Sequence, residues 1–181
     1  MGMALRVPQY TVADLDLLPD DGNRYELLAG TLLVTPSPGS AHQGVAAKLS
    51  AMFASHLLGR RIGLFSPGVV TLPPLTQLQP DVLVVPPRFA PGLPWEDINE
   101  YWLAVEVLSR SSQVYDREFK RDAYLALGVR EVWLVDVMNR SIGVYVQPGG
   151  GRVVQDVIEW IAPDSSVSVP VELEVLFANL V

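Results

Sequence analysis

The sequence has no cysteine and few charged residues. Without cysteine, disulfide frameworks, thiolate zinc sites and cysteine nucleophiles are excluded, and the absence fits a reducing compartment. Charged residues make up 18% of the 181 residues and hydrophobic residues 49%, which is the reverse of the balance in disordered chains. A chain of this length can bury a hydrophobic core without cross-links, so we expect one folded domain over residues 1–181.

Long apolar runs and a positive net charge are also missing. No run approaches the roughly 18 residues that span a bilayer, and we expect a cytoplasmic protein. The net charge is −7, whereas general nucleic-acid affinity comes from Lys and Arg. A nucleic-acid partner would therefore need a local basic patch. Residues 107–130 carry five Lys or Arg against three Asp or Glu, and Arg117 and Arg121 are the candidate substrate contacts.

Proline and glycine divide the chain into short segments whose apolar spacing alternates between helix and strand. The spacing predicts a short helix over residues 11–18, where Thr11 and Asp14 form a capping box, and a long helix from Ser40 to Gly59. A second long helix is predicted over residues 113–127. Strands are predicted over residues 24–28, 31–34, 62–72, 81–85, 102–108, 131–136, 141–147 and 152–158.

This order of elements predicts an α/β or α+β domain. We expect a mixed central β-sheet flanked by helices, with an N-terminal hairpin and antiparallel strands toward the C-terminus. Residues 171–180 carry no pattern that assigns them to a helix or a strand.

Two acidic residues in apolar strands are the main candidates for chemistry. Glu106 interrupts the apolar run 102–108, and an unpaired carboxylate there would cost several kcal/mol unless it reaches water, a partner, a proton or a metal. Asp81 opens a second apolar run after Pro80, where an Asp is commonly only a turn residue. If the two strands are neighbours, the two carboxylates converge and form a hard oxygen site suited to Mg²⁺ or Mn²⁺.

Lysine is scarce, since only Lys48 and Lys120 are present among thirteen basic residues. A lysine amine can lose its proton when its pKa falls, whereas arginine stays protonated, so the choice of Lys120 is informative. Asp116, Lys120 and Tyr124 follow at spacings of four and project from one helical face. The alternative is a surface ion pair between Asp116 and Lys120, which contributes only a few tenths of a kcal/mol.

The order of these residues resembles a known group of nucleases. Pro80-Asp81, followed by Glu106-Val107-Leu108 on a later strand, resembles the PD-(D/E)XK superfamily of restriction-endonuclease-like proteins. Leu108 stands where that superfamily has its lysine. The stretch 104–109 together with Lys120 and residues 128–136 resembles the Uma family, described as putative restriction endonucleases, in which this lysine lies on the following helix. The likeness extends upstream to residues 25–30 and His42.

The resemblance implies a restriction-endonuclease-like core and a metal-dependent endonuclease acting on nucleic acid, with DNA expected. Asp81, Glu106 and the main-chain carbonyl of Val107 would bind Mg²⁺, which Mn²⁺ could replace, and Lys120 would orient a water or take its proton. Glu26 would extend the carboxylate cluster, unless it is a hairpin residue facing solvent. His42 would contact a phosphate or assist proton transfer, unless it has only a structural role at the helix start.

A non-enzymatic function is the competing class. A nuclease fold that serves as a binding or assembly module would fit the acidic surface and the Leu108 departure. A homodimer or higher homo-oligomer is expected for either class, because symmetric dimers are the commonest assemblies.

Overall fold

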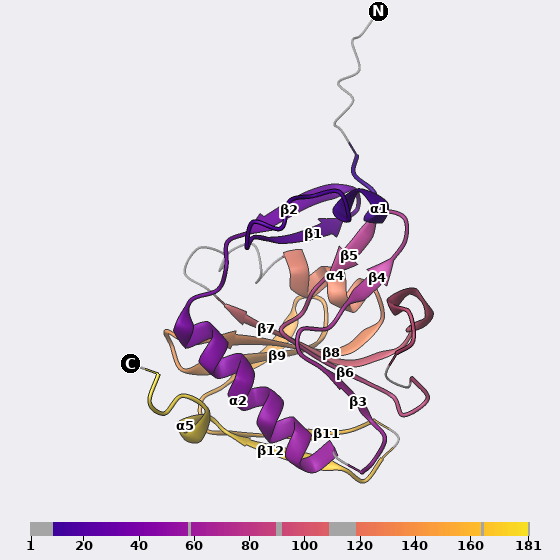
Figure 1. The fold of residues 1–181 in the computed structure, drawn as a ribbon. Helices are drawn as coiled ribbons and strands as arrows, with labels where there is room; N and C mark the ends of the chain where they lie inside the picture. The colour runs from indigo at the N-terminus through magenta and orange to yellow at the C-terminus, as the bar shows by residue number, and fades with distance from the viewer. Residues whose placement is uncertain (1–8, 58, 90–91, 109–118, 164, 181) are drawn as a thin grey trace, which may run out of the picture.

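The structure is a computed structural model that describes residues 9–57, 59–89, 92–108, 119–163 and 165–180 (Figure 1). Three sheets are present in these ranges: a four-stranded sheet in the order β2-β1-β5-β4, a six-stranded sheet in the order β10-β9-β8-β7-β6-β3, and the pair β11-β12. The strands are β1 (Arg24–Leu28), β2 (Thr31–Thr35), β3 (Gly63–Phe65), β4 (Val70–Leu72), β5 (Thr76–Leu78), β6 (Val82–Val85), β7 (Tyr101–Leu108), β8 (Val129–Asp136), β9 (Ser141–Gln147), β10 (Gly150–Val154), β11 (Val157–Ile161) and β12 (Ser168–Glu172). The helices are α1 (Val12–Leu15), α2 (Ser40–Leu57), the 3₁₀ turn η1 (Trp95–Asp97), α4 (Arg121–Ala126) and α5 (Leu173–Leu176).

The N-terminal segments follow the expected local rules. Thr11 and Asp14 form the predicted capping box, although α1 ends at Leu15, earlier than residue 18. The predicted hairpin is confirmed as β1 and β2. Its two-residue turn consists of Ala29 and Gly30, both with positive φ (49° and 80°), as the tight turns that match strand twist require.

The six-stranded sheet is mixed, as expected. Strands β7 and β8 are parallel and are joined by a connection that includes α4, whereas their outer neighbours are antiparallel. A parallel pair needs such a crossover because its strands start at the same end. The crossover therefore puts α4 against a face of the sheet, where it contacts β8 and β9.

Hydrophobic side chains cover both faces of the central sheet because strand residues alternate between them. Val82 and Val84 pack on the face covered by α2, β11, β12 and α5, whereas Leu83 and Val85 pack on the face toward α4 and the four-stranded sheet. Figure 1 shows α2 on one side of the central sheet and the hairpin β1–β2 with α4 on the other. A strand residue with the parity of Leu83 therefore faces α4.

Two predicted strands differ from the structure. The strand expected over residues 62–72 is two strands in different sheets, because Pro67 and Gly68 interrupt it: β3 pairs with β6, and β4 with β5. β5 itself was not predicted. The strand expected over residues 152–158 is also two strands, since the exposed turn at residues 155–156 separates β10 from β11. The unassigned segment 171–180 holds the end of β12 and α5.

The second long helix is described only in part. Residues 119–120 form a wide helical turn that leads into α4, and Gly128 ends the helix with a φ of 87°, as predicted. The remainder of the helix predicted over residues 113–127, with its cap at 109–112, lies outside the described residues.

Membrane crossing by a helix finds no support in this architecture. None of the helices in the described ranges is both long and apolar enough to span a bilayer.

Phe53 packs α2 against the central sheet and β11. It is fully buried, and its ring lies 5.7 Å from that of Trp133 on the sheet and 5.3 Å from that of Trp160 on β11. We expect Phe53→Ala to lower the free energy of unfolding by about 3–5 kcal/mol, since it leaves a cavity between two layers. Leu17 is 82% exposed. Leu17→Ala should therefore change the free energy of unfolding by less than about 0.5 kcal/mol, when both variants are compared with wild type by urea titration.

Candidate active site

Asp81 and Glu106 meet on the α4 face of the central sheet. In the antiparallel pair β6–β7, Val82 lies opposite Val105, so positions 81 and 106 are next in register. Both residues have the parity of Leu83 and Ala104, which face α4. Each is 3% exposed. The expected convergence of the two acidic residues at one edge is therefore present.

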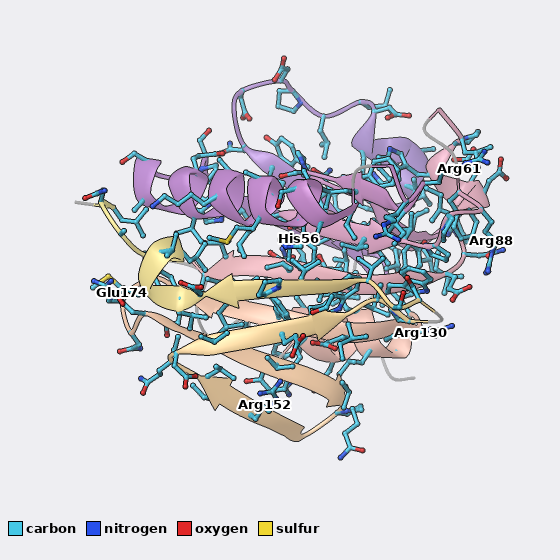
Figure 2. All side chains as sticks on the ribbon, turned by 90° about the horizontal axis from the view of Figure 1, so that it is seen from below. His56, Arg61, Arg88, Arg130, Arg152 and Glu174 are labelled. Carbon is cyan, nitrogen blue, oxygen red and sulfur yellow. The ribbon has the colours of Figure 1, made fainter. Side chains whose placement is uncertain are left out.

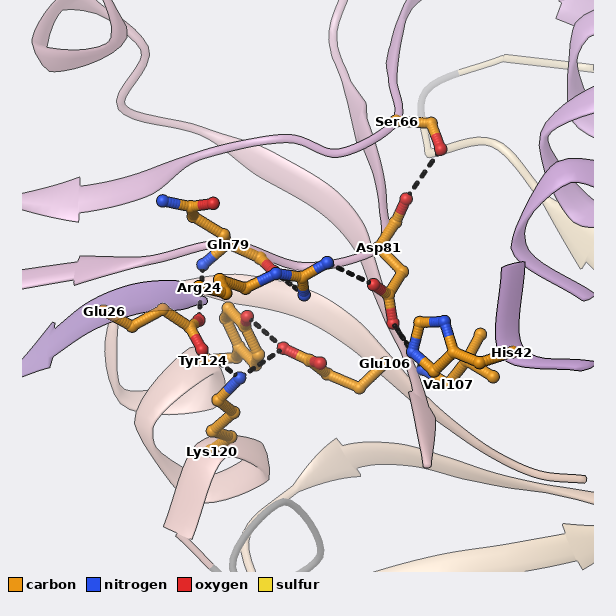
Figure 3. A network of polar contacts seen from close by, with 10 residues as sticks. All are labelled: Arg24, Glu26, His42, Ser66, Gln79, Asp81, Glu106, Val107, Lys120 and Tyr124. Atoms are coloured by element: carbon orange, nitrogen blue, oxygen red, sulfur yellow. Dashed lines mark hydrogen bonds and ion pairs between the residues drawn. The ribbon is translucent and has the colours of Figure 1, made fainter. Parts of the chain in front are cut away.

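Lys120 and Tyr124 reach Glu106 from α4 (Figure 3). The ammonium of Lys120 lies 3.4 Å from Glu106 Oε1, and the hydroxyl of Tyr124 donates a hydrogen bond of 2.5 Å to the same oxygen. The spacing of four residues puts both side chains on one helical face, as predicted from the sequence. Asp116, the third member of that face, lies outside the described residues.

Glu26 is buried and is held at both carboxylate oxygens. Its Oε2 accepts a hydrogen bond of 2.6 Å from Lys120, and its Oε1 accepts one of 2.7 Å from the backbone N–H of Gln79. Its exposed fraction is 0%, so the alternative of a hairpin residue facing solvent is wrong. Lys120 thus bridges two carboxylates, one from β1 and one from β7.

Asp81 has a separate set of partners. Its Oδ1 accepts a hydrogen bond of 3.0 Å from Arg24, and its Oδ2 accepts one of 2.8 Å from the backbone N–H of Val107. His42 Nε2, near the start of α2, lies 3.1 Å from Oδ2. Val107 therefore contacts Asp81 through its amide, while the expected role of its carbonyl stays a prediction.

Arg24 was missed by the sequence reasoning. The available signal was its position two residues before Glu26 in the same strand, which puts both side chains on one face. No local pattern in the sequence predicts the pairing of β1 with β5. This pairing brings β1 to residues 79–81.

The partners of these groups shift their pKa values. Burial acts to raise the pKa of Asp81, but His42, Arg24 and the amide of Val107 together lower it. Burial acts to lower the pKa of Arg24, but the charges of Asp81 and Glu106 raise it. Burial, with Glu106 next in effect, raises the pKa of Tyr124 well above 10.0, so its hydroxyl remains a donor at neutral pH.

The other candidate residues differ in how they relate to this cluster. Nδ1 of His42 is buried and has no hydrogen-bond partner among the described residues. Arg121 points elsewhere: its guanidinium binds Asp122 at 2.7 and 3.0 Å and lies 5.0 Å from the ring centroid of Tyr145. Its expected substrate contact stays a prediction, and Arg117 lies outside the described residues.

The donor set fits a hard divalent cation that keeps some of its water. Asp81 and Glu106 offer carboxylate oxygens from adjacent strands, and Mg²⁺ is commonly held by one or two carboxylates. In the described part of the chain, no group of three or more His, Cys, Asp or Glu side chains is arranged to hold a metal. Within the described part of the chain, the carboxylates of Glu26, Asp81 and Glu106 contact two basic side chains, Arg24 and Lys120, and Asp81 also contacts His42.

This arrangement can be compared with known proteins. Residues 12–177 match the Uma2 family, whose description is putative restriction endonuclease. The chain belongs to the Uma2 family. The family resemblance drawn from residues 25–145 is thus confirmed, and Asp81, Glu106 and Lys120 all lie within the matched range of this Uma2 chain.

Structural comparison agrees with the family. The chain is similar to a crystal structure from Anabaena variabilis described as that of a putative nuclease, with a TM-score of 0.72 and 18% identity over 94% of this chain and 99% of that one. At this identity the likeness establishes the shared fold, and with it the expected α+β class. No curated protein matches the chain.

The buried bridge made by Lys120 should be essential to stability. Lys120→Met removes the cation that bridges the buried carboxylates of Glu26 and Glu106, and we expect the free energy of unfolding, measured with urea at pH 7, to fall by about 3–5 kcal/mol. The double variant Glu26→Gln/Lys120→Met should be more stable than Lys120→Met, since one of those charges is removed. Lys48→Met is the control, because the partners of Lys48 among the described residues are neutral carbonyls of the C-terminal segment. Equal stability of Lys120→Met and wild type would contradict the bridge.

The pairing of Asp81 predicts an acid-dependent contribution to stability. Its pKa in the folded protein lies below the ordinary carboxyl value of 3.8, so the unfolded chain binds its proton more readily. The contribution is therefore complete above about pH 5 and is lost as the pH falls through the folded pKa. Unfolding free energies of wild type and Asp81→Asn, measured from about pH 6 to about pH 2, should converge toward low pH. A constant difference across that range would contradict it.

Proposed function

We propose that this protein hydrolyses phosphodiester bonds of nucleic acid, with DNA as the substrate, in a reaction that depends on a divalent cation. The observation that carries the proposal is the contact of Lys120 with Glu106 beside Asp81, on neighbouring strands of one sheet. The acids and the amine come from segments distant in sequence, yet they share one buried cluster. Membership in a family described as restriction endonucleases supports the choice of DNA.

Asp81, Glu106 and the carbonyl of Val107 are the proposed ligands of Mg²⁺. A bound Mg²⁺ supplies charge stabilisation at a phosphoryl oxygen and lowers the pKa of water. The protein's own part is to hold Asp81 and Glu106 in register through the antiparallel pairing of β6 and β7. Tyr124 fixes the Glu106 carboxylate through its hydroxyl, which leaves that carboxylate in one orientation.

Lys120 is the proposed group that orients the attacking water or takes its proton. The short contact with Glu26 at 2.6 Å, against 3.4 Å to Glu106, indicates that Glu26 holds the ammonium in position. Glu26 is thus proposed as a positioning residue rather than a ligand of a second ion. Since the oxygens of Glu26 are bound to Lys120 and Gln79, its reach toward a metal is restricted.

The Leu108 departure does not require an inactive scaffold. Leu108 is 4% exposed and belongs to the hydrophobic cluster between the sheet and α4. Its role is therefore packing. Lys120 supplies a positive group beside Glu106 from the helix instead. This contact favours the enzyme over a binding or assembly module.

The more exposed side chains of the cluster indicate the side from which a phosphate could approach. Arg24 and His42 have side chains that are 20% and 11% exposed, whereas Asp81 between them is 3% exposed. We propose that the phosphodiester approaches from this side, where two basic groups offset the acidic balance of the chain. A homodimer is proposed as the form that cuts two strands.

Replacement of Lys120 by arginine tests the proposal. Lys120→Arg keeps the charge, but guanidinium does not give up a proton readily, so we expect Mg²⁺-dependent cleavage of plasmid DNA to fall by about 100-fold or more. Asp81→Asn and Glu106→Gln should lose cleavage to a similar degree. The assay measures nicking rates with Mg²⁺, with Mn²⁺ and with chelator.

The matched control is Lys48→Arg, the same exchange at the chain's other lysine, and it should cleave at the wild-type rate. Lys48 lies on α2 and binds C-terminal carbonyls, away from the carboxylates. Cleavage that survives both Glu106→Gln and Lys120→Ala would come from a contaminant. Absence of cleavage from the folded wild type on DNA and RNA would favour the binding module.

A further inference from the structure

Arg24 binds the carboxylate of Asp81, which is a ligand of the proposed cation. It begins β1 and donates to Asp81 Oδ1 at 3.0 Å and to the carbonyl of Gln79 at 3.1 Å. Asp81 itself is buried, whereas the Arg24 side chain is 20% exposed. The ion pair therefore joins a fixed buried acid to a base at the edge of the cluster (Figure 3).

The three described partners of the Asp81 carboxylate differ in how they would respond to a cation. The amide of Val107 belongs to β7 and stays in the sheet, and His42 contacts the same oxygen from α2. Only Arg24 among these described partners carries a permanent charge, because guanidinium stays protonated. A divalent ion at Asp81 would be repelled by Arg24 and by neither of the other two in their neutral forms.

We infer that Arg24 is a positioning residue that competes with the divalent cation for Asp81. In the metal-free protein it neutralises the buried carboxylate and keeps it oriented by the second hydrogen bond to Gln79. When the cation binds, Arg24 gives up Asp81 Oδ1. This inference rests on the proposed function, since it takes Asp81 as a cation ligand.

The competition has a signature that a purely structural ion pair lacks. Loss of Arg24 removes the permanent cation from beside the buried Asp81 carboxylate, which destabilises the metal-free protein. The same loss removes the repulsion and one competitor, which strengthens cation binding. Stability without metal and affinity for metal should therefore move in opposite directions.

Mn²⁺ titration of the full chain tests this inference without any measurement of cleavage. Free Mn²⁺, followed by electron paramagnetic resonance, should report about tenfold tighter binding by Arg24→Gln than by wild type, a coupling of ordinary size for two linked sites. The melting temperature of Arg24→Gln should be lower than that of wild type without Mn²⁺ and should rise more when Mn²⁺ is added. Asp81→Asn should abolish binding in both backgrounds.

Arg88→Gln is the matched control. Arg88 pairs with Glu100 and follows β6, whereas Asp81 precedes it, so the same exchange removes an ion pair at the other end of that strand. Figure 2 shows Arg88 with Arg61 and Arg130 at one end of the molecule, opposite Glu174. Its Mn²⁺ affinity should equal that of wild type.

A second measurement uses the unchanged protein, in case Arg24→Gln fails to fold. The rate at which phenylglyoxal modifies Arg24, read from peptide masses, should rise on addition of Mn²⁺, while the rate at Arg88 should stay constant. An unchanged rate at Arg24 at saturating Mn²⁺ would overturn the competition.

The outcomes separate this inference from the proposed function. If wild type binds Mn²⁺ but Arg24→Gln binds it equally or more weakly, Arg24 is only structural and the proposed metal site stands. If Arg24→Gln binds more tightly but the wild type cleaves no nucleic acid, the competition stands and the proposed hydrolysis fails. If no form binds Mn²⁺, both fail.

Discussion

Three buried carboxylates, those of Asp81 and Glu106 on the α4 face of the central sheet and that of Glu26 on β1, impose the constraint on which the rest of this structure depends. An isolated charge in such surroundings would cost several kcal/mol, so Glu26, Asp81 and Glu106 each need a positive or hydrogen-bonding partner. Lys120 meets this need for two of them at once. The ion bridge therefore fixes β1 and α4 against β7, and the four-stranded sheet against the six-stranded one.

The bridge also explains how a helix can replace a strand as the source of the amine. A residue two positions after Glu106 shares its face, and in this chain that residue is the buried Leu108. The crossover that the parallel pair β7–β8 requires brings α4 over the same face. Lys120 at its start reaches Glu106 from above the sheet, so a positive group lies beside this carboxylate although position 108 is apolar.

The parts of the site that sequence reasoning predicted depend on local periodicity. Asp81 and Glu106 follow from two apolar strands, and Lys120 with Tyr124 follows from a spacing of four. The role of Glu26 as the partner of Lys120 could not be predicted, nor could Arg24, because both depend on the pairing of Leu27 with Gln77 fifty residues later. The division of residues 62–72 between two sheets has the same origin, since β5 carries little periodic signal of its own.

Stability alone does not account for this cluster. Replacement of a buried ion pair by apolar residues of similar volume is often neutral or stabilising, and the surrounding face of the sheet is already hydrophobic. A fold that needed only packing between β1, β7 and α4 would be served by such residues. Two carboxylates on adjacent strands, a lysine held between two acids and an arginine at the exposed edge are instead groups that the proposed phosphodiester hydrolysis would use. The free-energy cost of keeping them buried therefore supports the proposal that the cluster acts on a substrate.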